Sequence, residues 1–185
     1  MRTHQGCVIK RGMTTQANTK RIQRVVLLGI GLLAGWSVSS AWHQLPPRVA
    51  SHFNARGQPD GYMPREAFLA DLALLGGGFI VLLLLAPALL RVLPSSLINL
   101  PHRDYWLAPE RRNASFEYIA IWFGWFAIGT SVLLVVMLHL TLRANIAGTG
   151  LHPVAAGLSL GVYLVGVLTS LVYFHRKFKS LPTTA

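Results

Sequence analysis

The segment from Leu72 to Leu90, LALLGGGFIVLLLLAPALL, contains no charged residue and decides the fold class of this chain. A bilayer hydrocarbon core about 30 Å thick needs roughly 20 apolar residues of helix, and this segment is about that long. Inside lipid every backbone N–H and C=O must be paired within the protein, so a helix is expected rather than an isolated strand. The segment therefore predicts a membrane-spanning helix.

Three further stretches have the same character. Val25–Trp42 and Pro153–Phe174 are uncharged, and Tyr118–Leu142 is interrupted only by His139. Charged residues make up 12% of the chain, about half of the roughly 25% found in soluble proteins. The sequence predicts an all-α membrane protein, a four-transmembrane-helix bundle that occupies residues 25–175. The helices are expected at 25–42, 67–90, 118–142 and 153–174.

Basic residues are distributed unevenly between the two sides of the predicted bundle. Of the 17 Lys and Arg residues, 13 lie before the first helix, between the second and third, or after the fourth. Cytoplasmic segments carry an excess of Lys and Arg, so both termini are expected in the cytoplasm. Residues 1–24 are then a basic cytoplasmic arm and residues 176–185 a cytoplasmic tail. This topology accounts for the net charge of +11, so the lipid bilayer is the expected partner and nucleic acid is not.

The first helix has one alternative interpretation. A basic region before an apolar core, followed by Ser39-Ser40-Ala41, has the form of a cleaved signal peptide. The length of the basic region and the presence of Trp36 in the core favour an uncleaved anchor.

His139, an ionisable residue in the third helix, is a candidate functional group, although its place near the helix end allows it to reach water.

Glycines in the second and fourth helices predict a helix–helix contact. Small residues allow two backbones to approach closely in lipid. Gly76, Gly77 and Gly78 are therefore expected to pack against Gly157 and Gly161, which have G-x-x-x-G spacing. On this prediction a large side chain at position 161 lowers thermal stability.

The loop between the first two helices is extracytoplasmic on this topology and is dense in turn signals. From Leu45 to Gly61 it reads LPPRVASHFNARGQPDG. Asn54–Gly57 and Pro59–Gly61 predict turns, because Pro presets φ, Asn and Asp bond to nearby backbone, and Gly accepts positive φ. These two turns, directly after Phe53, predict an ordered cap over the helix ends, with Phe53 as its apolar anchor.

The polar residues of this loop are the candidate site. In a folded cap, His52, Asn54 and Asp60 could converge as a polar site, which makes them the candidates for ligand binding. The alternative is that these three residues only build the turns of the cap. Gly57 is expected to adopt a positive φ in either case.

The same loop carries a resemblance to a known family. The pattern L-P-x-x-h-x-x-H-F-N-x-x-G-x-P-D, with h apolar, resembles the bacterial membrane family called domain of unknown function 1648. That family is related to the N-terminal part of SdpI-type toxin-immunity proteins, so the resemblance implies a bacterial inner (plasma) membrane protein. The matching residues are Leu45, Pro46, Val49, His52, Phe53, Asn54, Gly57, Pro59 and Asp60, and Arg65 takes the place of the usual Lys.

A second motif, between the second and third helices, is similar to a segment of members of this family. It runs from Asn99 to Arg112, and its carboxylates have arginine neighbours. Ion pairing and docking to the membrane surface are therefore expected in preference to acid–base catalysis. The motif residues are Asp104, Tyr105, Trp106, Pro109, Glu110, Arg111 and Arg112.

The sequence gives no support for a catalytic or cofactor-binding motif. The chain contains no G-x-S-x-G, H-E-x-x-H or phosphate-loop sequence. His43, His52 and His152 could supply metal ligands with Asp60, but they lack the spacing of metal sites, so no metal or cofactor is expected.

The sequence favours a non-enzymatic membrane protein with an immunity-like or sensory role. Its first loop would recognise a peptide or a membrane-protein partner. One alternative is an accessory or regulatory subunit of a membrane transporter complex, docked through the basic inner loop. Another is a small membrane enzyme or transporter.

Overall fold

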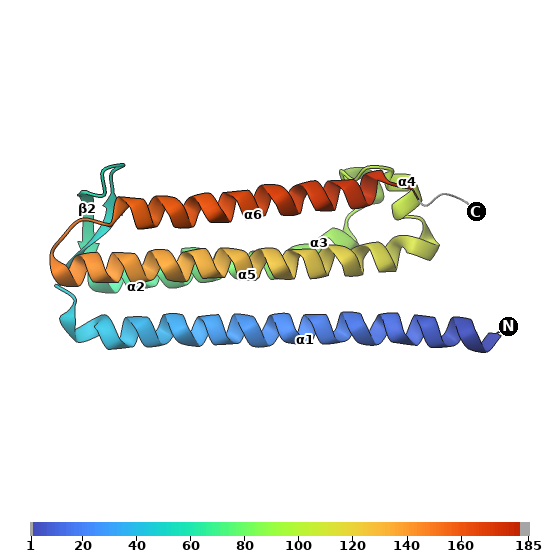
Figure 1. Cartoon of the computed structure of the whole chain (residues 1–185), viewed down its shortest axis with the longest axis horizontal. Coiled ribbons are helices and arrows are strands. Elements are labelled where there is room, and N and C mark those ends of the chain that lie inside the picture. Colours follow the sequence, from blue (N-terminus) through green and yellow to red (C-terminus); the bar gives the residue numbers. More distant parts are fainter. Residues whose placement is uncertain (1, 182–185) are drawn as a thin grey trace.

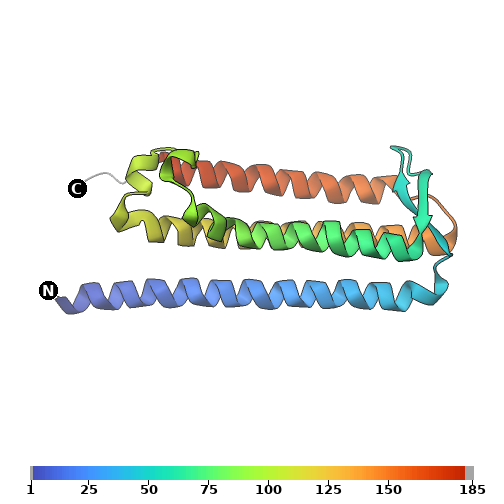
Figure 2. The same cartoon turned by 180° about the vertical axis from the view of Figure 1, so that it is seen from behind.

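The computed structural model describes the backbone of residues 2–181 and the side chains of residues 14–181. Long helices run side by side along one axis (Figure 1). Within the described residues, four of them are long and apolar enough to cross a membrane, which agrees with the four helices that the sequence predicts. The chain enters α1 and leaves α6 at one end of the bundle, called here the terminal end (Figures 1 and 2). The opposite end carries a β-hairpin and is called the hairpin end.

Helix α1 (Arg2–Ala41) begins well before Val25, where the sequence predicted the first helix to start. Residues 14–24 contain no Gly or Pro, so helix propagation from the apolar segment meets no break. The described part of the predicted arm 1–24 is therefore continuous with the membrane helix. A short 3-10 turn, η1 (Trp42–Gln44), follows it.

The second span is one long helix with a wider segment inside it. It consists of α2 (Arg65–Asp71), the π-helix η2 (Leu72–Gly77) and α3 (Gly78–Val92). The sequence predicts one helix from 67 to 90 for this span. The π segment includes two of the three consecutive glycines, where the absent side chains relax the packing of successive turns.

Helix α5 (Pro109–Ala147) is longer than the predicted 118–142. Pro109 stands in its first turn, where a missing N–H is no loss. Gly148, at φ 63°, ends the helix. The segment before it contains η3 (Ser95–Leu97) and the short helix α4 (Arg103–Trp106).

Helix α6 (Pro153–Lys179) extends the predicted 153–174 by more than a turn. His152 caps its start, because its Nδ1 accepts a hydrogen bond from the backbone N–H of Ala155. The predicted tail 176–185 thus begins inside the helix, and its residues beyond Leu181 lie outside the described part of the chain.

Helix α5 lies at the centre of the bundle and packs against α1, α3 and α6 (Figures 1 and 2). The predicted contact of Gly76–Gly78 with Gly157 and Gly161 is wrong. A Cβ built on Gly157 or Gly161 meets no neighbouring atom within 4 Å, and the nearest one for Gly76 is on Leu134 of α5. The glycine pattern identifies small residues on the helices. It does not identify the helix against which they pack, because the connections between the helices determine which of them are neighbours.

The loop between the first two spans is an antiparallel hairpin of β1 (Arg48–Phe53) and β2 (Pro59–Pro64). This corrects the all-α prediction for one short segment. The turn signal at Asn54–Gly57 is borne out by a hydrogen bond from Gly57 N–H to the Asn54 carbonyl. The second signal, Pro59–Gly61, forms no separate turn, since these residues pair with β1 as part of β2.

Candidate functional site

The hairpin turn is organised by the side chain of Asn54. Its Oδ1 accepts hydrogen bonds from the backbone N–H groups of Arg56, at 2.9 Å, and Gln58, at 3.1 Å. The backbone N–H of Asn54 also donates to the carbonyl of Gln58. Asn54 therefore has a structural role in the turn and does not join His52 and Asp60 in a common site.

Asn145 of α5 holds the first strand of the hairpin. Its Oδ1 accepts from the backbone N–H of Ala50 at 2.6 Å, and its Nδ2 donates to the Ala50 carbonyl at 3.0 Å. Ala50 is 5% exposed, so both of its backbone groups are shielded from water. One amide side chain thus substitutes for a third strand at this position.

Replacing Asn145 tests this contact. Asn145→Ala leaves the Ala50 N–H and C=O buried and unpaired, which costs about 1–3 kcal/mol of unfolding free energy. Thermal unfolding in detergent is the measurement. Asn145→Asp keeps the acceptor for Ala50 N–H and loses the donor, so its loss should be smaller than that of Asn145→Ala. Equal stability of Asn145→Ala and the wild type would show that the strand is held elsewhere.

The tip of the hairpin docks on the α5–α6 loop. Gly57 has φ 76°, and its carbonyl accepts a hydrogen bond from Leu151 N–H at 2.7 Å. A Cβ on Gly57 would lie 2.1 Å from the carbonyl oxygen of Leu151, and one on Gly150 would lie 2.5 Å from the carbonyl oxygen of Gly57. Only glycine at both positions permits this approach. The positive φ predicted for Gly57 is confirmed. The close approach to Leu151 is a second reason for glycine at this position, which the sequence did not reveal.

Arg65 holds the base of the hairpin to the end of α1. Its guanidinium lies 4.3 Å from the centre of the Trp42 ring and donates to the carbonyls of Trp42 and Leu45. Its backbone N–H donates to the carbonyl of Pro47. Arg65 is the basic residue of the family pattern, and these contacts give it a structural role.

An apolar cluster lies beneath the hairpin. Its buried members include Leu45 and Val49, which contact Leu138 and Leu142 of α5. Phe53, the predicted anchor, is only half-buried, so Leu45 and Val49 carry that role instead. The other two residues assigned to the structural motif are also half-buried, Pro46 before β1 and Pro59 opposite Phe53 in the sheet register.

His52 and Asp60 meet across the two strands. His52 Nδ1 lies 2.5 Å from Asp60 Oδ1, and the two side chains are 73% and 44% exposed. Gly61 faces His52 in the register, so no side chain opposes the imidazole there. Tyr62, 55% exposed, is the next large side chain along β2. These three residues, His52, Asp60 and Tyr62, are called the exposed hairpin group.

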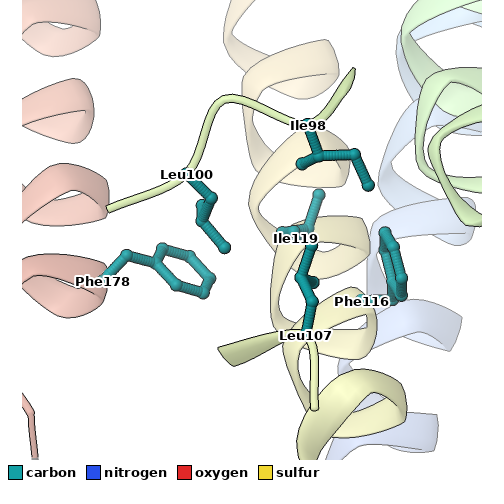
Figure 3. Packing of buried hydrophobic residues seen from close by; sticks show 6 residues of the cluster. All are labelled: Ile98, Leu100, Leu107, Phe116, Ile119 and Phe178. Carbon is teal, nitrogen blue, oxygen red and sulfur yellow. The ribbon is translucent and has the colours of Figure 1, made fainter. Parts of the chain in front are cut away.

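The terminal end holds the second motif in a separate apolar cluster. Figure 3 shows six buried residues of this cluster, which come from the segment between α3 and α5, from α5 itself and from α6. Trp106 packs against it and donates its indole N–H to the carbonyl of Phe178 at 2.7 Å. The labelled residues are Ile98, Leu100, Leu107, Phe116, Ile119 and Phe178.

The charged residues of this motif have different surroundings. Arg111 stacks on Tyr105 with 4.0 Å between the guanidinium carbon and the ring centre, and Arg112 donates to Ser95 Oγ and to the Arg91 carbonyl. Glu110, beside Pro109 in the first turn of α5, is exposed, as is Asp104. The two arginines therefore stabilise the fold of the segment between α3 and α5, whereas the two carboxylates are left at its surface.

Two polar contacts join α1 to the rest of the bundle at this end. Glu117 of α5 pairs with Lys20 of α1 at 2.5 Å and with Arg91 of α3 at 2.6 Å, and so joins three helices. Gln23 of α1 is 4% exposed and donates to the Ile121 carbonyl. Its amide lies over Gly124, where a Cβ would come within 2.4 Å of the Gln23 oxygen.

Sequence reasoning missed Asn145, Gln23 and Leu151. A polar amide near the end of an apolar helix was the available signal for Asn145, since such groups in membranes usually find a partner. Gln23 stood inside the predicted arm. No sequence signal marked Leu151, which acts through its backbone.

A metal site does not assemble from the histidines considered above. Among the residues whose side chains are described, 14–181, no group of three His, Cys, Asp or Glu could hold an ion.

Comparison with known proteins gives one family match. Residues 28–75 match the family model described as "Domain of unknown function (DUF1648)". The matched range includes the last third of α1, the whole hairpin, α2 and the start of η2, which confirms the resemblance to this family. No curated protein and no solved structure matches the chain. Asn145 and Leu151, which hold the hairpin, lie outside the matched segment.

Proposed function

We propose that this chain, whose residues 28–75 carry the domain of unknown function 1648, is a non-enzymatic multi-pass protein of the bacterial inner membrane. Its role is recognition, immunity-like or sensory, of a peptide or a membrane-protein partner. The partner contacts the exposed hairpin group at the extracytoplasmic surface, and both termini lie in the cytoplasm.

The observation that supports this proposal is an exposed polar pair on a hairpin that is fixed to the helices. Asn145, Leu151 and Arg65 fix the hairpin to the helices through backbone groups. His52 and Asp60 bond to each other, and within residues 14–181 neither side chain forms a hydrogen bond to a helix. An exposed ion pair contributes only about 0–1 kcal/mol to stability. The pair is thus available for a partner on a pre-organised surface, which lowers the entropy lost on binding.

The distribution of charge supports the orientation. Cytoplasmic segments carry the excess of Lys and Arg, and 13 of the 17 basic residues belong to the terminal end. Aromatic rings gather there as well, and the Trp122 ring contacts both Phe126 and Phe174. Such rings favour the membrane–water boundary.

Stability measurements separate the pair from the turn. His52→Ala and Asp60→Asn should change the unfolding free energy by less than about 1 kcal/mol. Asn54→Ala removes the acceptor for two backbone N–H groups and should lower it by about 1–2 kcal/mol. Thermal unfolding in detergent and abundance in membranes are the readouts. A parallel loss in all three variants would mean that His52 and Asp60 only build the hairpin.

Photo-crosslinking in intact cells tests the recognition itself. A benzophenone amino acid replaces Tyr62, and a matched one replaces Asp104 at the terminal end. The proposal predicts a discrete adduct from position 62 that is lost with His52→Ala or Asp60→Asn while abundance is unchanged. No adduct from position 62 together with a discrete adduct from position 104 would favour the accessory-subunit alternative and reject recognition by the hairpin.

A further inference from the structure

A cavity of about 1310 Å³ opens at the hairpin end between α1, α5 and the start of α6. Its wall toward the middle of the bundle is apolar, with Leu33 and Trp36 from α1 and Val136 from α5. Its mouth is basic and polar, and none of the lining residues in the described part of the chain is Asp or Glu. The basic groups are Arg56 from the hairpin turn, His139 and Arg143 from α5, and His152 before α6.

The hydrogen bond between Arg143 and His139 determines which hydrogen-bonding groups remain free at the mouth of the cavity. Arg143 Nε donates to His139 Nε2 at 2.9 Å. A guanidinium stays protonated, so Nε2 is the acceptor and the His139 ring carries its proton on Nδ1. Within residues 14–181, the terminal nitrogens of Arg143 and the guanidinium of Arg56 have no hydrogen-bond partner. Several N–H donors and two positive charges therefore face one opening.

We propose that this cavity binds one anionic phospholipid, with its phosphate at the basic mouth and its acyl chains along the apolar wall. Guanidinium groups match phosphate oxygens in pairs of hydrogen bonds, and a positive site without a carboxylate selects for an anion. Trp36 is 73% exposed and Leu33 is 54% exposed, and both belong to a candidate membrane span. A water-soluble anion would leave this apolar wall without a partner. The lipid would also touch Arg56, and so the hairpin turn.

Native mass spectrometry of the full chain in detergent tests the proposal. The probe is dioleoylphosphatidylglycerol, with dioleoylphosphatidylcholine as the zwitterionic comparison. We expect one retained phosphatidylglycerol, bound at least roughly fivefold more tightly than phosphatidylcholine. Arg143→Gln and Arg56→Gln should each weaken its binding by roughly fivefold, since each removes one charge at the mouth. Arg143→Lys should retain most of the affinity.

Arg48→Gln is the matched control, because Arg48 is an exposed hairpin arginine that does not line the cavity. The control should bind like the wild type, and Arg143→Gln should unfold at the wild-type temperature without lipid. An equal loss in Arg48→Gln would overturn the proposal, since general surface charge would then explain the binding. Unchanged binding in Arg143→Gln would overturn it as well. Displacement of the lipid by millimolar inorganic phosphate would also overturn it and assign the site to a free anion.

Discussion

Gly57→Ala should produce the largest loss of stability of any single-methyl change in the hairpin. The left-handed conformation, φ 76°, alone disfavours alanine by about 1–2 kcal/mol. The new Cβ would also lie 2.1 Å from the Leu151 carbonyl oxygen, a backbone atom that cannot move without shifting the α5–α6 loop. The hydrogen bond from Leu151 N–H to Gly57 should break as the loop shifts. We expect a total loss above about 3 kcal/mol, measured by thermal unfolding in detergent.

Gly148→Ala is the matched control for this change. Gly148 has φ 63°, but a Cβ there meets no atom within 4 Å. Gly148→Ala should lower the unfolding free energy only by the cost of the left-handed conformation, about 1–2 kcal/mol. If the two variants lost equal stability, the contact between the hairpin tip and the α5–α6 loop would contribute nothing.

Gly124→Leu should separate α1 from α5 and give the second large effect. The Gln23 amide occupies the space above Gly124 and is 4% exposed. A leucine would displace this amide from the Ile121 carbonyl, which leaves a buried polar group unpaired at about 1–3 kcal/mol. Overpacking between the helices adds about 1–3 kcal/mol. We expect a loss of roughly 3 kcal/mol or more, seen as a lower unfolding temperature in detergent.

Gly161→Leu provides the comparison, because Gly161 has no neighbour within 4 Å and lies on the open side of α6. It should leave the unfolding temperature close to that of the wild type, the reverse of what the glycine spacing predicted. Gln23→Ala combined with Gly124→Leu should lose less than the sum of the two single changes, since the displaced amide is gone. Strict additivity would mean that Gln23 and Gly124 are not in contact.

The helices could be predicted from the sequence because lipid imposes one strong constraint, a long apolar segment with internally paired backbone. Their ends were less predictable. The change from charged to apolar residues predicts helix starts at Val25 and Tyr118, but the helices continue past them to Arg2 and Pro109. Helix propagation depends on the absence of breakers, whereas the apolar pattern marks only the part that lies in lipid.

The candidate site was predicted in part. Turn chemistry located an ordered loop, but it could not distinguish a strand from a turn at Pro59–Gly61, because strand pairing depends on a partner distant in the sequence. His52 and Asp60 do meet, whereas Asn54 serves the turn. The contacts that hold the hairpin come from Asn145 and Leu151, far along the chain and on other elements. No local pattern encodes such a contact.

Recognition by the exposed hairpin group requires that the hairpin end faces outward. Cysteine labelling in intact cells measures this directly, in a chain with Cys7→Ser and a single new cysteine, Tyr62→Cys or Asp104→Cys. Both positions are exposed, Tyr62 by 55% and the Asp104 side chain by 94%. A membrane-impermeant maleimide should label position 62 in intact cells and position 104 only after permeabilisation. Labelling of position 104 from outside, with position 62 protected, would place the hairpin in the cytoplasm and contradict the proposed role.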